Sequence, residues 1–241
     1  FAKSPAEAAA GAEMVFVCVG NDDDVRSVIF GDSGVLAGMA TGVTLVDHTT
    51  TSAILARELG VACYAKGISF LDAPVSGGQA GAENAALTIM IGGSEDTYKA
   101  VEPVIDSYAK KSKLLGPVGS GQLAKMVNQI CIAGVVQGLS EALNFASASG
   151  LNADDVVEVI SKGAAQSWQM ENRSATMVRG EFEFGFALDW MRKDLGFALA
   201  EAEKNDIPLP VTKLVDGFYE EIQKNGGGRW DTSALITLLK Q

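Results

Sequence analysis

The sequence predicts an α/β domain followed by an all-α domain, with one long helix joining them. Short β-branched apolar runs alternate with helical segments in the first half, whereas no segment after Leu115 has a strand pattern. From Gln122 to about Ser149, apolar residues recur at helical spacing without a proline. Strands separated by helices are typical of a largely parallel sheet. We therefore expect an α/β domain over residues 1–117 and an all-α domain, which includes the joining helix, over residues 118–241.

The predicted strands of the first domain are near-continuous apolar runs, as expected for strands that are buried on both faces. They cover residues 13–19 (EMVFVCV), 42–47 (GVTLVD), 68–73 (ISFLDA) and 87–91 (LTIMI), with a short strand near 113–115. The predicted helices between them cover residues 25–30, 54–65 and 94–109.

The joining helix is predicted to run through 28 residues, from Gln122 to Ser149. At 1.5 Å per residue such a helix is about 40 Å long, which exceeds what a small domain needs. The segment Gly150-Leu151-Asn152 ends it. Further helices are expected over residues 154–161, 187–204, 210–224 and 232–239.

Composition and charge exclude several classes of partner. Hydrophobic residues make up 47% of the chain, charged residues 20%, and the formal net charge is −11. Since lysine and arginine form no block, we expect no nucleic-acid partner. No run approaches about eighteen uninterrupted apolar residues, so we expect no membrane partner either.

Cysteine and histidine usage predicts a cytoplasmic protein without a metal site. The three cysteines, Cys18, Cys63 and Cys131, are far apart and each lies in an apolar run, which favours buried free thiols. A zinc site is difficult to assemble around a single histidine, His48. The chain starts at Phe1 without a methionine, and residues 6–11 have the pattern of a helix end. We therefore expect a preceding segment, and a signal peptide stays open.

A serine-glycine segment follows the third predicted strand. Residues 72–81 read DAPVSGGQAG, so that Ser76 is followed by Gly77 and Gly78. Consecutive N–H groups in a glycine turn can form an anion-binding concavity, and the serine hydroxyl adds a donor. Taken alone, the segment favours a tight turn with ordinary glycines; a cradle for a substrate carboxylate is the alternative.

The start of the joining helix carries a polar stripe. In residues 121–129 (GQLAKMVNQ), Lys125, Asn128 and Gln129 stand at positions i, i+3 and i+4 and therefore share one face. A lysine that lines a mostly apolar cleft can have its pKa lowered enough to exchange a proton near neutral pH. Taken alone, the stripe favours a solvated face of an amphipathic helix, with a catalytic site as the alternative.

Three other features have two interpretations each. Lys193 stands beside Asp194 in a predicted helix, which taken alone is typical of a surface charge pair. Trp168 lies in a predicted loop over residues 163–170, where it is either a core residue, which we favour, or a lid over the site. His48 follows a strand end but has no evident carboxylate partner, which favours a structural role.

Taken together, these segments resemble the 3-hydroxyacid dehydrogenase family, which includes 3-hydroxyisobutyrate dehydrogenase and tartronate semialdehyde reductase. The substrate signature is matched by DAPVSGGQAGA at residues 72–82, and the catalytic G-x-x-x-K-x-x-N pattern by Gly121, Lys125 and Asn128. The K-D-L segment is matched at residues 193–195. The ending NGGGRWDTSAL at residues 225–235 looks most like the tartronate semialdehyde reductase branch. One departure is Ala85-Ala86, where the family usually has Gly-Thr.

The resemblance implies a Rossmann-type N-terminal domain and a hydride transfer with NAD or NADP. The G-x-G-x-x-G fingerprint would then precede Phe1, so the domain is incomplete here, and the segment that decides between NAD and NADP is absent. Lys125 would be the proton donor and acceptor. The implied cofactor contacts are Val19, Gly20, Thr50 and Lys193, and the implied substrate contacts are Ser76, Gly77, Gly78, Asn128, Gln129 and Trp168.

The substrate would be a small carboxylate, namely a short 3-hydroxy acid or its semialdehyde. Tartronate semialdehyde, with glycerate as its reduced form, is the first choice and 3-hydroxyisobutyrate the second. An unpaired polar group such as Gln129 would disfavour the methyl-bearing compound. The apolar faces of the all-α half predict a homodimer or homotetramer.

Two alternatives remain open at this point. The first is a phosphogluconate- or imine-type reductase relative with the same architecture, although the arginines that a phosphorylated substrate would need, Arg173, Arg179 and Arg192, are scattered. The second is a non-catalytic oligomeric binding module without a complete cofactor site. The presence of Lys125, Asn128 and the serine-glycine segment argues against the second, because a scaffold does not need them.

Overall fold

The computed structural model describes residues 1–239. Two compact units make up the chain, Phe1–Met126 and Val127–Gln241. The long helix α7 (Ser120–Ala148) begins in the first unit and continues into the second. Because the two units divide within α7, this helix supplies residues to both of them.

The first unit is built on one sheet, which is mixed, whereas the alternation of strands and helices predicts a largely parallel one. The strand order is β1-β2-β3-β5-β4, and β6 pairs with β5. Neighbours β1, β2 and β3 are parallel, as are β5 and β6, whereas β5 runs antiparallel to β3 and β4. The strands are β1 (Met14–Val17), β2 (Thr44–Asp47), β3 (Ser69–Asp72), β4 (Val75–Ser76), β5 (Leu87–Gly92) and β6 (Ala109–Gly116).

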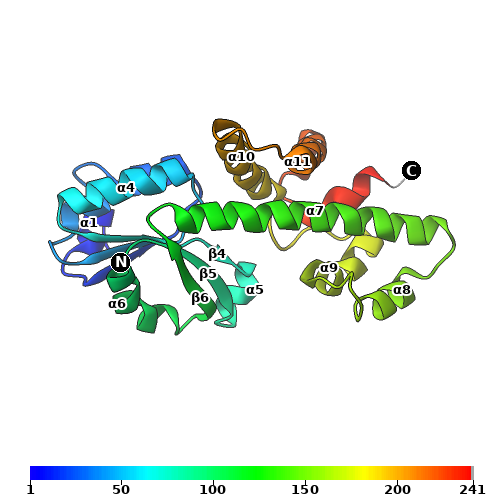
Figure 1. Cartoon of the computed structure of the whole chain (residues 1–241), viewed down its shortest axis with the longest axis horizontal. Coiled ribbons are helices and arrows are strands. Elements are labelled where there is room, and N and C mark those ends of the chain that lie inside the picture. Colours follow the sequence, from blue (N-terminus) through cyan, green and yellow to red (C-terminus); the bar gives the residue numbers. More distant parts are fainter. Residues whose placement is uncertain (240–241) are drawn as a thin grey trace. The chain divides into compact units, whose positions relative to one another are not determined.

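Helices cover both faces of this sheet (Figure 1). Successive residues of a strand point to opposite faces, so Leu45 packs in the cluster that includes Leu55 of α4, while Val46 packs in the cluster that includes Val101 of α6. The helices of this unit, apart from α7, are α1 (Pro5–Ala9), α2 (Asp22–Ile29), α3 (Val35–Gly38), α4 (Ala53–Ala65), α5 (Gly78–Glu83) and α6 (Glu95–Ile105).

Polar caps fix where these helices begin. Ser52 and Ser94 each accept a hydrogen bond from an N–H in the first turn of α4 and α6, respectively. Asn21 does the same for α2, which therefore begins at Asp22 rather than at the predicted residue 25. The short helices α3 and α5 were not predicted, because four and six residues are too few to establish an apolar period.

Helix α7 agrees closely with the predicted joining helix. It has 29 residues and begins at Ser120, two residues before the predicted start. Among residues 1–239 it is the one helix long and apolar enough to cross a membrane by length and composition. A core helix meets the same test, and Val136, Leu139 and Leu143 of α7 are buried in the core of the second unit.

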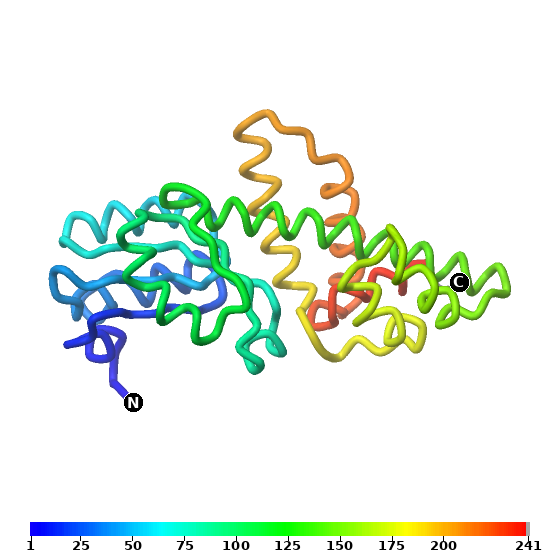
Figure 2. Tube along the Cα trace, turned by 60° about the horizontal axis from the view of Figure 1, so that its bottom comes forward, coloured from blue at the N-terminus to red at the C-terminus, as the bar shows by residue number. Residues whose placement is uncertain are grey.

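The second unit is helical, as predicted. Within residues 127–239, β-type pairing is limited to one isolated bridge between Ala187 and Asp231. The chain of α10 turns back into α11, so that these two helices lie side by side (Figure 2). The elements after α7 are α8 (Ala153–Ile160), α9 (Trp168–Arg179), α10 (Leu188–Lys204), α11 (Pro210–Ile222), the π-helical turn η1 (Gln223–Gly227) and the 3-10 helix η2 (Thr232–Leu238).

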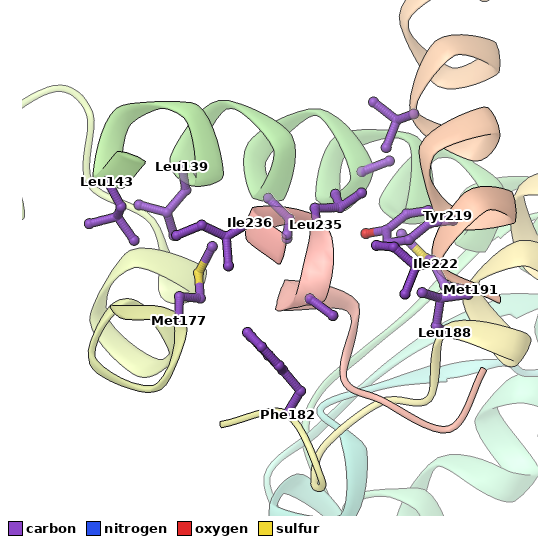
Figure 3. Packing of buried hydrophobic residues seen from close by; sticks show 14 of the residues in the cluster. Leu139, Leu143, Met177, Phe182, Leu188, Met191, Tyr219, Ile222, Leu235 and Ile236 are labelled. Carbon is purple, nitrogen blue, oxygen red and sulfur yellow. The ribbon is translucent and has the colours of Figure 1, made fainter. Parts of the chain in front are cut away.

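One continuous apolar cluster holds the second unit together (Figure 3). Leu139 and Leu143 of α7, Met177 of α9 and Ile236 of η2 contribute to this cluster. Tyr219 of α11 is fully buried at its other end, close to Ile222. The helical residues that follow Asn128 on α7 are thereby fixed against the rest of this unit.

Candidate functional site

The start of α7 is anchored by a buried carboxylate at the end of β3. Asp72 has no exposed surface; its Oδ1 accepts a hydrogen bond from the N–H of Gly119 at 2.7 Å, and its Oδ2 accepts one from Gln122 at 2.9 Å. The first N–H groups of a helix lack partners within the helix, so a carboxylate there is favourable. Burial raises the pKa of Asp72, and these N–H groups oppose the rise.

Close packing accompanies this anchor. Gly121 approaches the sheet so closely that an added Cβ would lie 2.5 Å from the carbonyl oxygen of Met90 and 2.6 Å from that of Asp72. Only glycine lets the helix backbone come this near to the strands. The position and orientation of the first turns of α7 are therefore set by Asp72 and Gly121 together.

Lys125 lies one turn further along α7 and is brought to the serine-glycine segment. Its side chain is almost fully buried, with 6% exposure, and Nζ donates a hydrogen bond of 2.9 Å to the carbonyl oxygen of Val75. Val75 directly precedes Ser76 in β4. Two segments that are fifty residues apart in sequence thus meet, and the interpretation of Lys125 as part of a solvated helix face is wrong.

The serine-glycine segment is a tight turn with a short helix rather than an open loop. Ser76 pairs with Thr88 in the sheet, and the chain then turns at Gly77 (φ 133°) and Gly78 (φ 60°), where α5 begins. Both glycines have positive φ values that other residues rarely adopt. Ser76 is half-buried, whereas Gly77 and Gly78 are exposed, so backbone of this turn is accessible to a ligand.

The expected cofactor contacts Val19, Gly20 and Thr50 lie after the carboxyl ends of two neighbouring parallel strands. Val19 and Gly20 follow β1, and Thr50 follows β2. The N–H of Val19 donates to Oγ1 of Thr49 at 3.0 Å, which joins the two segments. Ligands of open α/β sheets bind outside the carboxyl ends of the strands.

These two segments are accessible to a ligand. Val19 is 36% exposed and Thr50 is half-buried, so both can be reached. Asp22, the first residue of α2, accepts two hydrogen bonds from Ser52. The N–H of Ser52 donates to it at 2.9 Å and the hydroxyl at 2.6 Å. A carboxylate tied in this way is held in place against α4.

Asp47, at the end of β2, is the most strongly perturbed carboxyl of this region. Its Oδ1 accepts the N–H of Thr49 at 2.9 Å, whereas the buried Oδ2 has no hydrogen-bond partner among the described residues. Burial raises the pKa of Asp47 to about 6, and the nearby carboxylate of Asp72 adds to the rise. The sequence did not single out this residue, since an aspartate at a strand end is common.

Within the second unit, Asn128 and Gln129 belong to a chain of polar contacts. The amide nitrogen of Asn128 donates to Oε1 of Gln129 at 2.8 Å, and Nε2 of Gln129 donates to Oδ2 of Asp194 at 2.7 Å. Lys193 Nζ lies 3.3 Å from the other oxygen of Asp194. Gln129 is therefore not an unpaired group, contrary to the expectation from sequence.

The Lys193–Asp194 pair is not a surface pair. The side chain of Asp194 is 2% exposed and that of Lys193 is 18% exposed. Lys193 Nζ also lies over the rings of Trp190 and Phe197, 5.5 and 5.7 Å from their centroids. A surface pair contributes little, whereas removing one partner of a buried pair leaves a costly unpaired charge.

Trp168 is neither in a loop nor in the core. It is the first residue of α9 and is 54% exposed. Its ring covers the guanidinium of Arg173 at 4.8 Å, and Arg173 in turn pairs with the buried Asp231 at 3.2 Å. The helix starts here because Ser167 caps it, a signal that the sequence contains.

The remaining candidates behave as structural groups. Nδ1 of His48 lies 2.6 Å from the carbonyl oxygen of Ala73, and Nε2 lies 2.9 Å from the hydroxyl of Tyr108; burial lowers the pKa of His48. The prediction of three buried thiols is wrong for two of them, since Cys63 is buried but Cys18 and Cys131 are exposed. Among the described residues, no group of three or more potential metal ligands occurs.

Two family models match the chain. One, described as "NAD-binding of NADP-dependent 3-hydroxyisobutyrate dehydrogenase", matches residues 119–239. The other, described as "NAD binding domain of 6-phosphogluconate dehydrogenase", matches residues 1–116. Together they cover both the α/β part and the helical part of the chain.

Relatives agree with these matches. An uncharacterized oxidoreductase of Shewanella frigidimarina is 60% identical over 240 residues, which are 100% of this chain and 82% of that protein. The 2-hydroxy-3-oxopropionate reductase of Escherichia coli is 34% identical over 229 residues, which are 95% of this chain and 78% of that protein. The crystal structure of 3-hydroxyisobutyrate dehydrogenase from Salmonella typhimurium superposes with a TM-score of 0.87 at 32% identity, covering 98% of this chain and 82% of that one. The chain therefore belongs to the 3-hydroxyacid dehydrogenase family, a family of oxidoreductases that use NAD or NADP.

Proposed function

We propose that this enzyme interconverts a short 3-hydroxy acid and its semialdehyde, with Lys125 as the group that donates and accepts the proton. The observation that carries this proposal is the position of Lys125, whose buried Nζ is held 2.9 Å from the Val75 carbonyl, next to Ser76. A proton donor must lie within hydrogen-bond reach of the atom it protonates. A substrate carboxylate bound at the serine-glycine turn would have its neighbouring carbons near this ammonium.

The cofactor and Lys125 have separate roles in this reaction. The nicotinamide supplies or removes the hydride when it is bound. In the reduction direction the substrate carbonyl oxygen becomes an alkoxide, and the ammonium of Lys125 gives it a proton. In the oxidation direction the neutral amine of Lys125 takes the hydroxyl proton back. The Val75 carbonyl accepts from Nζ and keeps the side chain turned toward the serine-glycine turn.

The carboxylate would be held by Ser76, Gly77 and Gly78. The serine hydroxyl is a donor, and the positive φ values of both glycines free the backbone N–H groups of the turn from a regular strand. Backbone N–H groups arranged in this way bind anions. One such turn suits one carboxylate, which supports a short monocarboxylic substrate.

Asn128 would orient the substrate directly, one helical turn from Lys125 on α7. Gln129 would act with it, because its amide accepts from Asn128 and donates to Asp194. Lys193, paired with the same Asp194, would stand on the cofactor side. Trp168, half-exposed at the start of α9, would contribute an aromatic surface to the substrate side.

We propose tartronate semialdehyde as the substrate for reduction, with glycerate as its product, and 3-hydroxyisobutyrate as the second choice. The E. coli relative, named 2-hydroxy-3-oxopropionate reductase, supports the first, and the S. typhimurium structure, named 3-hydroxyisobutyrate dehydrogenase, supports the second. We further propose that the enzyme is a cytoplasmic homodimer or homotetramer.

The test is a hydride-transfer assay with the purified protein, followed through the absorbance of NADH or NADPH. Tartronate semialdehyde, glycerate, 3-hydroxyisobutyrate and 6-phosphogluconate are compared with each cofactor. Turnover of the unphosphorylated acids is the expected result. Turnover of 6-phosphogluconate alone, or of none of the compounds, would contradict the proposal.

A further inference from the structure

Gln122 joins α7 to the segment that follows β2. Its side-chain Oε1 accepts the N–H of Thr51 at 3.0 Å, and its Nε2 donates to the carbonyl oxygen of Thr49 at 2.8 Å. All three residues are buried, each with 1% exposure. The side-chain amide of Gln122 therefore binds the backbone on both sides of Thr50.

The same residue is held from its backbone. The N–H of Gln122 donates to Oδ2 of Asp72 at 2.9 Å, so that both ends of the residue are fixed by buried partners. Thr49 continues the contacts outward, because its Oγ1 accepts the N–H of Val19. The two segments that carry the cofactor contacts Val19 and Thr50 are thus tied to the first turn of α7.

We infer that Gln122 is a positioning residue for the reaction, which sets the cofactor segment at a fixed distance from Lys125. This inference rests on the proposed function. Gln122 and Lys125 stand three residues apart on one helix, so a shift of the Thr49–Thr51 segment relative to Gln122 is a shift relative to Lys125. Hydride and proton transfer need the reacting atoms aligned, and a displacement of about 1 Å can lower a rate about a hundredfold.

An amide is suited to this task, and most other side chains are not. The segment offers one donor, the N–H of Thr51, and one acceptor, the carbonyl of Thr49, so the bridging group must both accept and donate. Methionine has nearly the same length but cannot replace either bond. A carboxylate can accept from Thr51 but cannot donate to Thr49, and it would be buried near the carboxylates of Asp47 and Asp72.

The first experiment compares Gln122→Met with Gln137→Met. Gln137 is a matched control, since it lies on the same helix, is 9% exposed, and donates to Glu141 at 2.7 Å away from these contacts. In single-turnover measurements on folded enzyme, we expect Gln122→Met to lower the hydride-transfer rate about a hundredfold. The cofactor Kd should change by less than about threefold, and Gln137→Met should leave both values unchanged.

A second variant separates positioning from general loss of structure. In Gln122→Glu the introduced carboxyl, once protonated, can accept and donate like the amide. Burial and the neighbouring carboxylates raise its pKa, so the hydride-transfer rate should recover as the pH falls, relative to wild type at the same pH. A rate that tracks wild type at every pH would overturn the inference.

A third readout does not depend on activity. Amide hydrogen exchange at Thr51 should accelerate in Gln122→Met and stay at the wild-type rate in Gln137→Met, because only the former removes its acceptor. Unchanged exchange at Thr51, or a single-turnover rate within about threefold of wild type, overturns the role of Gln122. If wild type transfers no hydride to any short 3-hydroxy acid, the proposed function fails, while the exchange measurement still decides whether Gln122 holds this segment.

Discussion

The Nζ atom of Lys125 lies 2.9 Å from the carbonyl oxygen of Val75. This contact holds a buried ammonium at the end of β4, beside the serine-glycine turn. It requires α7 to approach the sheet closely, which Gly121 permits, and to start at a fixed point, which Asp72 provides. One hydrogen bond thus depends on the packing of three elements.

Lys125→Ala should abolish proton transfer while leaving the fold and the cofactor affinity nearly intact. Loss of general acid catalysis lowers rates about a hundredfold to ten-thousandfold, and we expect kcat to fall within that range. Lys66→Ala is the matched control, since Lys66 Nζ also donates to a backbone carbonyl, that of Leu36, at 3.1 Å. A kcat for Lys125→Ala within about threefold of the control would refute the assignment.

Gly121→Ala should destabilise the enzyme because the added methyl group meets two backbone carbonyl oxygens that cannot move independently of the sheet. Overpacking of this kind typically costs about 1–3 kcal/mol. Gly134→Ala, also on α7, meets no atom within 4 Å and should stabilise by about 0.5–1 kcal/mol through the better helix propensity of alanine. Thermal denaturation of the two variants measures the difference; equal melting temperatures would contradict the close approach at Gly121.

Asp47→Asn should gain stability relative to wild type as the pH rises. The pKa of Asp47 is raised from 3.8 to about 6 in the folded protein. A raised pKa means that the stability contributed by this carboxyl is present below about pH 4 and is lost as the pH rises through about 6. The difference corresponds to about 3 kcal/mol.

Denaturant unfolding at pH 4 and pH 7 measures this effect. The stability of Asp47→Asn minus that of wild type should be larger at pH 7, since asparagine does not ionise. Asp32→Asn, at an exposed position, is measured beside it as the control. If the difference for Asp47→Asn is independent of pH, ionisation of the buried Asp47 carboxyl does not destabilise the folded protein, and the prediction is wrong.

The elements with strong periodicity were predictable, and the short ones were not. The strands around Leu45 and Leu71 and the long helix α7 follow from apolar runs and helical spacing. The two-residue strand β4 and the helices α3 and α5 are fixed by tertiary pairing and by glycine geometry, as at Gly77. Trp168 begins a helix rather than lying in the predicted loop, because the Ser167 side chain caps α9.

The site was predictable as a set of residues but not as a set of contacts. The spacing of Lys125 and Asn128 identifies a polar stripe, yet nothing in sequence spacing reveals that Lys125 meets Val75, fifty residues earlier. Gln122 belongs to the same motif, but the partners of its side chain lie more than seventy residues away. Burial changed the interpretation of Asp194 from a surface charge to a buried acceptor.

Phe145→Glu should weaken self-association. Three apolar residues on one side of α7 are exposed in the single chain: Val127 by 61%, Val135 by 41% and Phe145 by 69%. An exposed apolar stripe of this length favours contact with a second copy. Sedimentation at micromolar concentration should give a dimer or larger assembly for wild type and a lower mass for Phe145→Glu. Tyr64→Glu, at a residue of α4 that is 87% exposed, is the control; a wild-type mass of 25.1 kDa would refute the assembly.

The last prediction concerns the choice between a hydroxyl and a methyl group on the substrate. We expect Asn128 rather than Gln129 to make this choice, because Gln129 is already bound by Asn128 and Asp194. Asn128 uses one N–H of its amide for Gln129, and its other polar positions can bind the extra hydroxyl of glycerate. A methyl group at the same place would leave the half-buried amide of Asn128 without this partner, at a cost of up to about 1–3 kcal/mol.

We therefore expect kcat/KM for glycerate to exceed that for 3-hydroxyisobutyrate by about fivefold to a hundredfold, both in the oxidation direction. Asn128→Leu should reduce this ratio, because the variant removes the polar group that distinguishes the two substrates. Asn172→Leu, at an exposed position of α9 where the side chain donates to the Trp168 carbonyl, should leave the ratio unchanged. A higher kcat/KM for 3-hydroxyisobutyrate in wild type would show that the tartronate semialdehyde branch is the wrong one, because a methyl group would then be preferred beside Asn128.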